Sequence, residues 1–288
     1  MLSLVIPCLN PNDPNLSRLV KSIKSQSFKD FEILVVSEGT SESAKAIGIR
    51  QARGSVIGIL ASDNELVDKD FLVEHYRNAL FMGASYPIRY FHSPSDDILN
   101  RYFSLLGGND PLAYYMGKND RSSYLPGGGF NQSGSIGDNG YFIRKDLIEK
   151  TDLDNYYHID NALEAQALTA VLPYTIWHHT GGNLFKFFIK RYRYGLQHAF
   201  NKNRRWHLVD FRKPQDIMRL TWFIFVTLTI IQPLYLSIRG YLKVRDKAWF
   251  LHPMACLMTL FTYALVMLSR IINPLFQSSS APMVARRA

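Results

Sequence analysis

The sequence predicts an α/β domain with a largely parallel sheet, followed by a basic segment and two apolar helices. Short apolar runs alternate with amphipathic helical patterns over about the first 180 of its 288 residues. Two long apolar runs occupy the last third, and basic side chains gather between the two parts. Strands that alternate with helices in this way form parallel sheets whose connecting loops gather at one edge.

The alternating pattern predicts the residue ranges of the individual strands and helices. Strands are expected at 2–6, 31–36, 56–60, 85–91 and 171–177, and 137–145 is expected to be a polar turn that enters a short strand. Helices are expected at 16–23, 43–53, 69–81 and 96–106, with one more starting near 158. The stretch 107–137 is rich in loop residues, and such a long irregular stretch is typical of a binding loop or lid, with disorder as the alternative.

The run Val56–Leu60 is followed at once by Ala61-Ser62-Asp63-Asn64. Because the run has no polar alternation, it predicts a strand that is covered on both faces. Ligands of open α/β sheets bind just beyond the carboxyl ends of such strands. Asp63 is therefore the first candidate for a functional residue, against the alternative of a turn residue that caps the next helix.

Charge is distributed unevenly along the chain, which carries a formal net charge of +9. The stretch 181–216 has only Asp210 and Asp216 against nine basic residues: Lys186, Lys190, Arg191, Arg193, Lys202, Arg204, Arg205, Arg212 and Lys213. A basic belt directly before apolar helices indicates binding to an anionic membrane surface. Nucleic acid is the competing partner, and the apolar runs favour the membrane over it.

The apolar runs 217–238 and 248–268 are each about long enough to cross a hydrocarbon core of ~30 Å. If both cross, the linker with Arg239, Lys243, Arg245 and Lys247 faces away from the cytosol, against the positive-inside rule. A shallow or re-entrant hairpin would remove this conflict. The sequence thus predicts a membrane anchor and leaves its depth open.

Two cysteines, Cys8 and Cys256, provide neither a disulfide framework nor the spacing of a zinc site. The first residues lack a basic leader, and their apolar run is too short for a signal peptide. We therefore expect the α/β domain on the cytosolic side of the cell membrane.

Four segments resemble the inverting family-2 glycosyltransferases, which have the GT-A fold that binds nucleotide-diphospho-sugars. The segments are Leu4–Asn10, Leu19–Phe28, Ile33–Thr40, and Arg53-Gly54 with Ile59–Asn64, and the likeness extends from Leu2 to about Gly182. The resemblance implies that the acidic end of the second strand binds the base of the donor. It also implies that the last segment corresponds to the family's Asp-x-Asp metal-binding region.

The chain departs from the family pattern at two positions. The first Asp of the Asp-x-Asp pair is Ala61, which leaves Asp63, and the acidic pair after the second strand is Ser37-Glu38. In some relatives a His after the last strand approaches the metal, so the resemblance makes His178 or His179 the supplementary ligand. The family's Glu-Asp base motif corresponds to Ile159-Asp160.

The resemblance implies a set of site residues and a cofactor. Mg²⁺ or Mn²⁺ would be bound by Asp63 with His178 and His179, since both ions suit oxygen ligands and phosphate. Asp160 is the expected general base, with Asp138 as its substitute and a helix N-cap as the alternative role. The expected donor-binding residues are Pro7, Asn10, Glu38, Arg53, Ser62, Asp63 and Asn139.

We therefore expect an enzyme that transfers a sugar from a nucleotide-diphosphate donor to a polyprenyl- or other lipid-linked acceptor. A polyprenyl-phosphate sugar synthase and an inactive membrane scaffold are the alternatives, and a homo-oligomer stays open. The expected division is 1–182 for the GT-A catalytic domain, 183–216 for the basic interfacial segment, 217–275 for the membrane helices and 276–288 for a polar tail.

Overall fold

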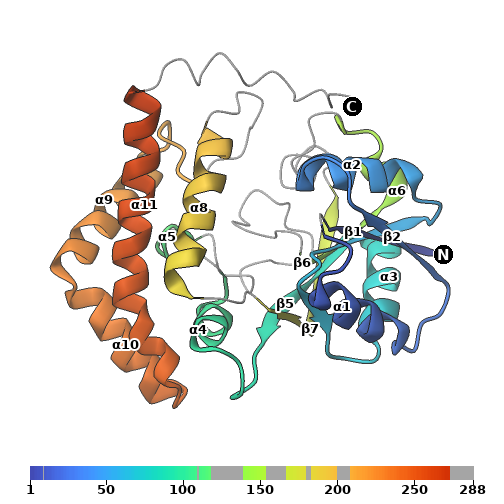
Figure 1. The fold of residues 1–288 in the computed structure, drawn as a ribbon, viewed down its shortest axis with the longest axis horizontal. Helices are drawn as coiled ribbons and strands as arrows, with labels where there is room; N and C mark the ends of the chain where they lie inside the picture. The colour runs from blue at the N-terminus through green and yellow to red at the C-terminus, as the bar shows by residue number, and fades with distance from the viewer. Residues whose placement is uncertain are drawn as a thin grey trace. The chain divides into compact units, whose positions relative to one another are not determined.

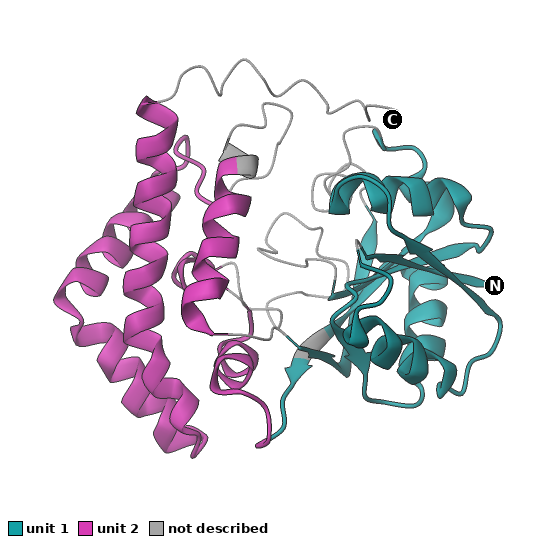
Figure 2. Ribbon diagram, in the orientation of Figure 1, with its two compact units in different colours: residues 1–93, 118–180 teal, residues 94–117, 181–288 magenta. Residues whose placement is uncertain are grey.

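A computed structural model of the chain describes residues 1–8, 10–108, 110–117, 139–153, 167–179, 183–199 and 208–272 (Figure 1). It forms two compact units (Figure 2). The first comprises Met1–Ser93 and Lys118–Thr180, and the second comprises Pro94–Gly117 and Gly181–Ala288. The second unit thus takes in Pro94–Gly117, which the sequence had assigned to the catalytic domain.

The first unit is built on a mixed sheet of seven strands in the order β2-β1-β3-β6-β5-β7-β4. The strands are β1 (Leu2–Pro7), β2 (Phe31–Val36), β3 (Val56–Leu60), β4 (Asn64–Leu66), β5 (Gly83–Phe91), β6 (Asn139–Arg144) and β7 (Leu168–His178). β1, β2, β3, β5 and β7 run in one direction, while β6 and β4 run in the other. The predicted α/β class with a mostly parallel sheet is therefore confirmed.

The strand register brings the ends of several strands to one edge of the sheet. Leu2 of β1 lies opposite Phe31 and Val56, so β1, β2 and β3 start at the same level and end at the same edge. The antiparallel β6 begins at this edge, where Asn139 pairs with Leu60. β7 also ends there, because it runs parallel to β5 in the direction of β3. This carboxyl edge is where the candidate residues gather.

Helices cover both faces of the sheet, which explains why β3 is apolar throughout. Side chains alternate along β1, so that Leu4 joins the core beneath α1 (Pro14–Lys24) and α3 (Phe71–Met82), while Val5 joins the core beneath α2 (Ser41–Gln51). A short helix, α6 (Lys145–Ile148), follows β6. All five residues of β3 are buried. The sheet is thus a rigid layer that fixes the position of the turn after β3.

The second unit is helical in its described part. Its helices are α4 (Ile98–Leu106), α5 (Pro111–Tyr115), α8 (Leu184–Ala199), α9 (Pro214–Thr229), α10 (Ile231–Lys243), the 3-10 helix η3 (Lys247–Leu251) and α11 (His252–Ile272). α8 lies alongside α11 (Figure 1). The short α5 lies within the stretch that the sequence predicted to be loop-rich.

A buried ion pair connects three of these helices. Asp110 caps the start of α5 by accepting a hydrogen bond from the Leu112 amide at 2.9 Å. The other carboxylate oxygen of Asp110 contacts the Arg191 guanidinium of α8 and accepts a hydrogen bond from the Tyr263 hydroxyl of α11 at 2.6 Å. The Arg191 side chain is 25% exposed and that of Asp110 9%, so removing either member would leave a largely buried charge unpaired, which is destabilising.

The apolar run 217–238 does not form the single membrane helix that the sequence predicted. α9 ends at Thr229 and α10 starts at Ile231, with a bend of 84° between them. Ile230 at the break has a φ of 61°, in the left-handed region. Pro233 explains why the chain restarts here, because proline is tolerated in the first turn of a helix and disrupts a helix interior. Among the described residues, Lys247–Ile272 is the helix long and apolar enough to cross a membrane.

Candidate functional site

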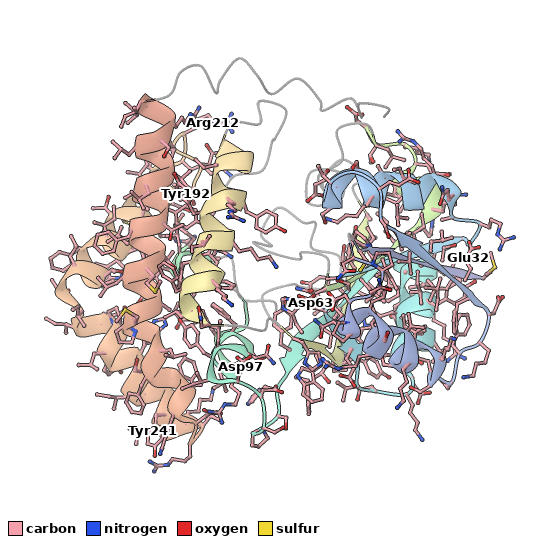
Figure 3. The ribbon with its side chains drawn as sticks, viewed as in Figure 1. Glu32, Asp63, Asp97, Tyr192, Arg212 and Tyr241 are labelled. Carbon is pink, nitrogen blue, oxygen red and sulfur yellow. The ribbon has the colours of Figure 1, made fainter. Side chains whose placement is uncertain are left out.

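The turn after β3 presents Asp63 at the carboxyl edge of the sheet (Figure 3). The turn is closed by Asn64, whose amide donates to the Ala61 carbonyl and whose side-chain oxygen accepts from the Ala61 amide, both at 3.0 Å. Asn64 itself is fully buried, whereas 23% of the Asp63 side chain stays exposed. A carboxylate is therefore held at the edge by a rigid turn and still meets solvent.

The last strand brings an imidazole to Asp63. Asn64 pairs with His178 in the antiparallel β4–β7 pair, and the His179 amide donates to the Asp63 carbonyl at 2.8 Å. This backbone pairing places His178 Nε2 at 3.3 Å from Asp63 Oδ2. The structure thus brings together two of the three residues that the sequence proposed as metal ligands.

The structure does not bring His179 to the same carboxylate. Its Nε2 lies 2.9 Å from Glu65 Oε2, and its ring packs against Trp177 at a centroid distance of 4.6 Å. The reason is the geometry of a strand, in which successive side chains point to opposite faces. Two neighbouring histidines at a strand end therefore have different partners.

A chain of side-chain hydrogen bonds connects the turn to β6 and β5. Asn64 Nδ2 donates to Asn139 Oδ1 at 2.9 Å, and Asn139 Nδ2 donates to the Tyr90 hydroxyl at 2.9 Å. The Tyr90 ring lies 5.8 Å from the His178 ring. Asn139 is buried, and both its side-chain oxygen and its side-chain nitrogen form hydrogen bonds. It therefore holds Asn64, and with it the turn that carries Asp63, in place. Tyr90 was missed by the sequence reading, although its place near the end of an expected strand is a signal that points to this edge.

Four other predicted donor-binding residues lie at the same edge by topology. Pro7 ends β1, Asn10 follows it, Glu38 follows β2, and Ser62 lies in the turn beside Asp63. Asn10 and Glu38 are exposed, while Pro7 and Ser62 are half-buried. The two candidate general bases, Asp138 and Asp160, lie outside the described residues.

Arg53 is placed at the opposite edge of the sheet. It precedes β3, and its guanidinium lies 2.8 Å from Glu32 at the start of β2. The backbone amide of Arg53 also donates to Glu32, at 2.7 Å. A five-residue strand separates this edge from Asp63 by roughly 16 Å. Glu32, labelled in Figure 3, lies away from Asp63 within the same unit. The predicted role of Arg53 in donor binding is therefore not supported by its position.

The Asp63 and His178 pair fits a divalent cation as a partial set of ligands. Carboxylate oxygen and imidazole nitrogen are both ordinary ligands of Mn²⁺, and Mg²⁺ is often bound by one or two carboxylates together with substrate phosphates. Among the described residues, no group of three or more His, Cys, Asp or Glu side chains is placed to hold a metal ion. Within the described part of the chain the pair is therefore a partial set of ligands, which the phosphates of a bound substrate and water can extend.

Comparisons with known proteins give distant similarities. The sequence matches no protein-family model and no curated protein. Among solved structures, residues 1–349 of S. aureus TarS match with a TM-score of 0.45 and 13% identity, covering 94% of this chain and 91% of that one. A mannosyltransferase from Pyrobaculum calidifontis, in complex with GDP-Man and Mn²⁺, matches with a TM-score of 0.47 and 11% identity over 91% and 86% of the two chains.

A third similar structure is glucosyl-3-phosphoglycerate synthase from Mycobacterium tuberculosis, in complex with Mn²⁺ and UDP-glucose. Its TM-score is 0.41 and its identity 12%, covering 69% of this chain and 78% of that one. At these TM-scores and identities, the matches carry no conclusion about the activity of this chain. The assignment of a function therefore depends on the site itself.

Proposed function

We propose that the protein is a membrane-attached inverting glycosyltransferase that moves a sugar from a nucleotide-diphosphate donor to a lipid-linked acceptor at the cytosolic membrane face. The observation that carries the proposal is the pairing of Asp63 with His178 at the carboxyl edge of the sheet. Open α/β sheets bind their ligands at this edge. Three of the segments that resemble family-2 glycosyltransferases, Leu4–Asn10, Ile33–Thr40 and Ile59–Asn64, end at this edge.

The donor would lie across the loops that follow β1, β2 and β3. Glu38 is exposed beyond β2 and is the residue that we assign to the base of the nucleotide. Ser62 and Asn10 provide hydrogen-bonding groups nearer the centre of the edge. Asp63 and His178 would face the diphosphate and hold a divalent cation. When bound, the cation supplies positive charge that offsets the negative charge developing on the departing diphosphate.

The chain's own residues would orient the sugar for attack and accept a proton. An acceptor hydroxyl loses its proton as it attacks the anomeric carbon from the face opposite the diphosphate. We assign this proton to the carboxylate of Asp160, with Asp138 as its substitute. Asn64, Asn139 and Tyr90 keep the Asp63 turn in place, so that the carboxylate does not have to reorganise during the reaction.

The proposal is tested with purified full-length protein in detergent. It is incubated with nucleotide sugars, Mn²⁺ and polyprenyl-linked acceptors, and both nucleotide release and product mass are measured. Asp63→Asn should lower turnover by about 100-fold or more, as loss of one preorganised electrostatic group does elsewhere. Asp146→Asn is the matched control, because this carboxylate lies after β6 at the other edge and pairs with Arg144. Unchanged turnover in Asp63→Asn would refute the mechanism.

The two histidines provide a second, internal comparison. His178→Gln should raise the Mn²⁺ concentration needed for half-maximal turnover, whereas His179→Gln should leave it unchanged, because His179 pairs with Glu65. An inactive scaffold would show neither turnover nor a thermal stabilisation by nucleotide diphosphates that depends on Mn²⁺. Product mass separates a glycan-extending enzyme from a polyprenyl-phosphate sugar synthase.

A further inference from the structure

Each of the three C-terminal helices exposes a stripe of large apolar side chains. The stripe of α11 consists of Met254, Phe261, Leu265, Leu268 and Ile272, each at least half exposed. α9 exposes Met218, Trp222, Phe225 and Leu228, and α10 exposes Ile231, Tyr235, Ile238 and Leu242. The members of each stripe follow the three- and four-residue spacing of one helix face.

The buried face of α11 is the more polar one. His252, Cys256, Thr259 and Thr262 point into the unit and are buried, and His252 Nδ1 lies 2.8 Å from the Tyr102 hydroxyl of α4. A helix of a water-soluble protein has the opposite arrangement, with its apolar side inward. Continuous exposed apolar stripes of this size are covered by a partner, and hydrocarbon is the partner that matches stripes made of uncharged, mostly apolar side chains.

α8 is fixed along much of the length of α11. At one end Phe187 packs in the same cluster as Ala255, and at the other a methyl group on Gly195 would lie 2.8 Å from Val266. Between these points Arg191 and Tyr263 share Asp110, and the Tyr192 hydroxyl is 2.9 Å from Ser269 Oγ (Figure 3). The two helices therefore have to enter or avoid the hydrocarbon together.

Burial of the outer face of α8 in hydrocarbon would be strongly unfavourable. Lys186, Lys190 and Arg193 are exposed and line a hollow on the surface of α8 together with Ile189 and Tyr194. The 16 residues of α8 extend for about 24 Å, most of a ~30 Å hydrocarbon core. If α11 crossed the membrane, these three cations would enter the core beside it, where exposed charges are strongly disfavoured. At the headgroup level, in contrast, the same cations meet anionic lipid.

The bend between α9 and α10 suits insertion into one leaflet. Arms of 16 and 13 residues with a bend of 84° between them form a wedge whose tip at Ile230 would reach a depth of roughly 15 Å, about half of the hydrocarbon core. Both open ends of the wedge are basic, with Lys213 before α9 and Lys243 at the end of α10. A wedge in one leaflet keeps both basic ends on the cytosolic side, as the positive-inside rule requires.

We propose that the helical unit is a monotopic anchor, in which α9, α10 and α11 embed their apolar stripes in one leaflet and no helix crosses the bilayer. α8 then lies at the headgroup level with its cations toward anionic lipid. The proposal rests on the membrane attachment included in the proposed function, and it does not depend on the transfer reaction. It chooses the shallow arrangement among those that the sequence left open for the membrane anchor.

The experiment measures on which side of the membrane three positions lie. Single cysteines are introduced by Lys213→Cys before α9, Lys243→Cys at the end of α10 and Ser279→Cys after α11, and the full-length protein is expressed in a bacterial host. A membrane-impermeant maleimide is added to inverted vesicles and, separately, to spheroplasts. The parent protein is the control, because its two cysteines, Cys8 and Cys256, are buried.

A monotopic anchor predicts that all three cysteines are labelled in inverted vesicles and none in spheroplasts. If Lys213→Cys and Lys243→Cys are labelled from opposite sides, α9 and α10 together form a span and the proposal is wrong. Opposite labelling of Lys243→Cys and Ser279→Cys would show that α11 crosses, which overturns it equally. The readout does not use enzymatic activity, so its failure is distinguishable from failure of the proposed reaction.

Discussion

Asn64 determines whether Asp63 has a defined position. Its side chain accepts from the Ala61 amide and donates to Asn139, and it is fully buried. Asn64→Ala removes both hydrogen bonds and leaves buried polar groups unpaired, which costs about 1–3 kcal/mol for each such group. We expect a loss of about 2–4 kcal/mol in the free energy of unfolding, measured by urea titration, together with weaker nucleotide binding.

The matched control for this change is Asn78→Ala. Asn78 lies on α3, where its side chain donates to the Glu74 carbonyl of the same helix at 2.8 Å. The loss of this local bond should change the unfolding free energy by about 0.5 kcal/mol or less, because surface substitutions rarely cost more. Equal effects of the two substitutions would show that the Asn64 hydrogen bonds do not stabilise the turn.

His75 should make the first unit sensitive to acid. The ring is fully buried between Phe71 and Phe142, and burial lowers the pKa of His75 from 6.5 to about 3. The Ser85 hydroxyl donates to the His75 carbonyl, so Ser85 Oγ accepts a hydrogen bond from the Nδ1–H of His75. An unfolded chain binds a proton at this histidine below about pH 6.5, whereas the folded chain does so only near pH 3.

The contribution of His75 to the free energy of unfolding is therefore complete above about pH 6.5. It decreases as the pH drops towards 3, by up to about 1.4 kcal/mol for each pH unit. His75→Phe keeps a ring in the core and removes the titration. We expect the difference in unfolding free energy between pH 7 and pH 5 to be smaller in this variant by roughly 2 kcal/mol. An unchanged pH dependence in urea titrations would mean that His75 does not contribute.

At the level of elements, the close approach of α10 to η3 depends on a glycine. A Cβ on Gly240 would lie 2.3 Å from Cδ2 of the Trp249 ring. Gly240→Ala therefore forces the ring to move, and overpacking of this kind costs about 1–3 kcal/mol even though alanine favours a helix. Thermal unfolding in detergent should show a lower midpoint temperature.

A second substitution tests whether the Trp249 ring is the cause. Trp249→Leu makes room beside Gly240 and is itself destabilising, because it removes a large side chain. In the double variant the two effects should be less than additive, with a favourable coupling of about 1 kcal/mol or more. If the changes in unfolding free energy simply add, the destabilisation by Gly240→Ala does not come from contact with the Trp249 ring.

The sequence predicts those elements whose signals are local. β2 and β3 have the expected bounds, 31–36 and 56–60, because each is an apolar run that ends at turn residues. The break at Ile230 was not predicted, since a left-handed isoleucine depends on its surroundings. The three-residue β4 is too short to produce a pattern, and it is formed by pairing with β7, far along the chain.

The same distinction applies to the candidate site. The position of Asp63 follows from its place after a buried strand, which the sequence shows directly. The choice between His178 and His179 depends on which of them faces Asp63, and this is fixed by the pairing of Asn64 with His178. Arg53 was assigned to the donor from a family motif, whereas the strand direction takes it to the other edge, beside Glu32.

At the scale of the whole molecule, the basic face of α8 should determine which membranes the protein prefers. Lys186, Lys190 and Arg193 are exposed together on this helix. A basic residue near an anionic surface contributes about 1 kcal/mol, so replacing all three by Gln should lower the preference for anionic over neutral vesicles by roughly a hundredfold. Flotation of the full-length protein with mixed vesicles at low salt measures this preference.

The matched control replaces three exposed lysines of the first unit, Lys21, Lys24 and Lys29, by Gln. Both triple variants lose the same net charge, so a general electrostatic attraction would lower the preference equally in the two. A local effect of α8 would lower it in the first variant alone, and the difference should shrink at high salt because screening weakens exposed charges. With α8 at the headgroup level, the apolar stripes keep the protein on the vesicles in both variants, and only the choice between lipids changes.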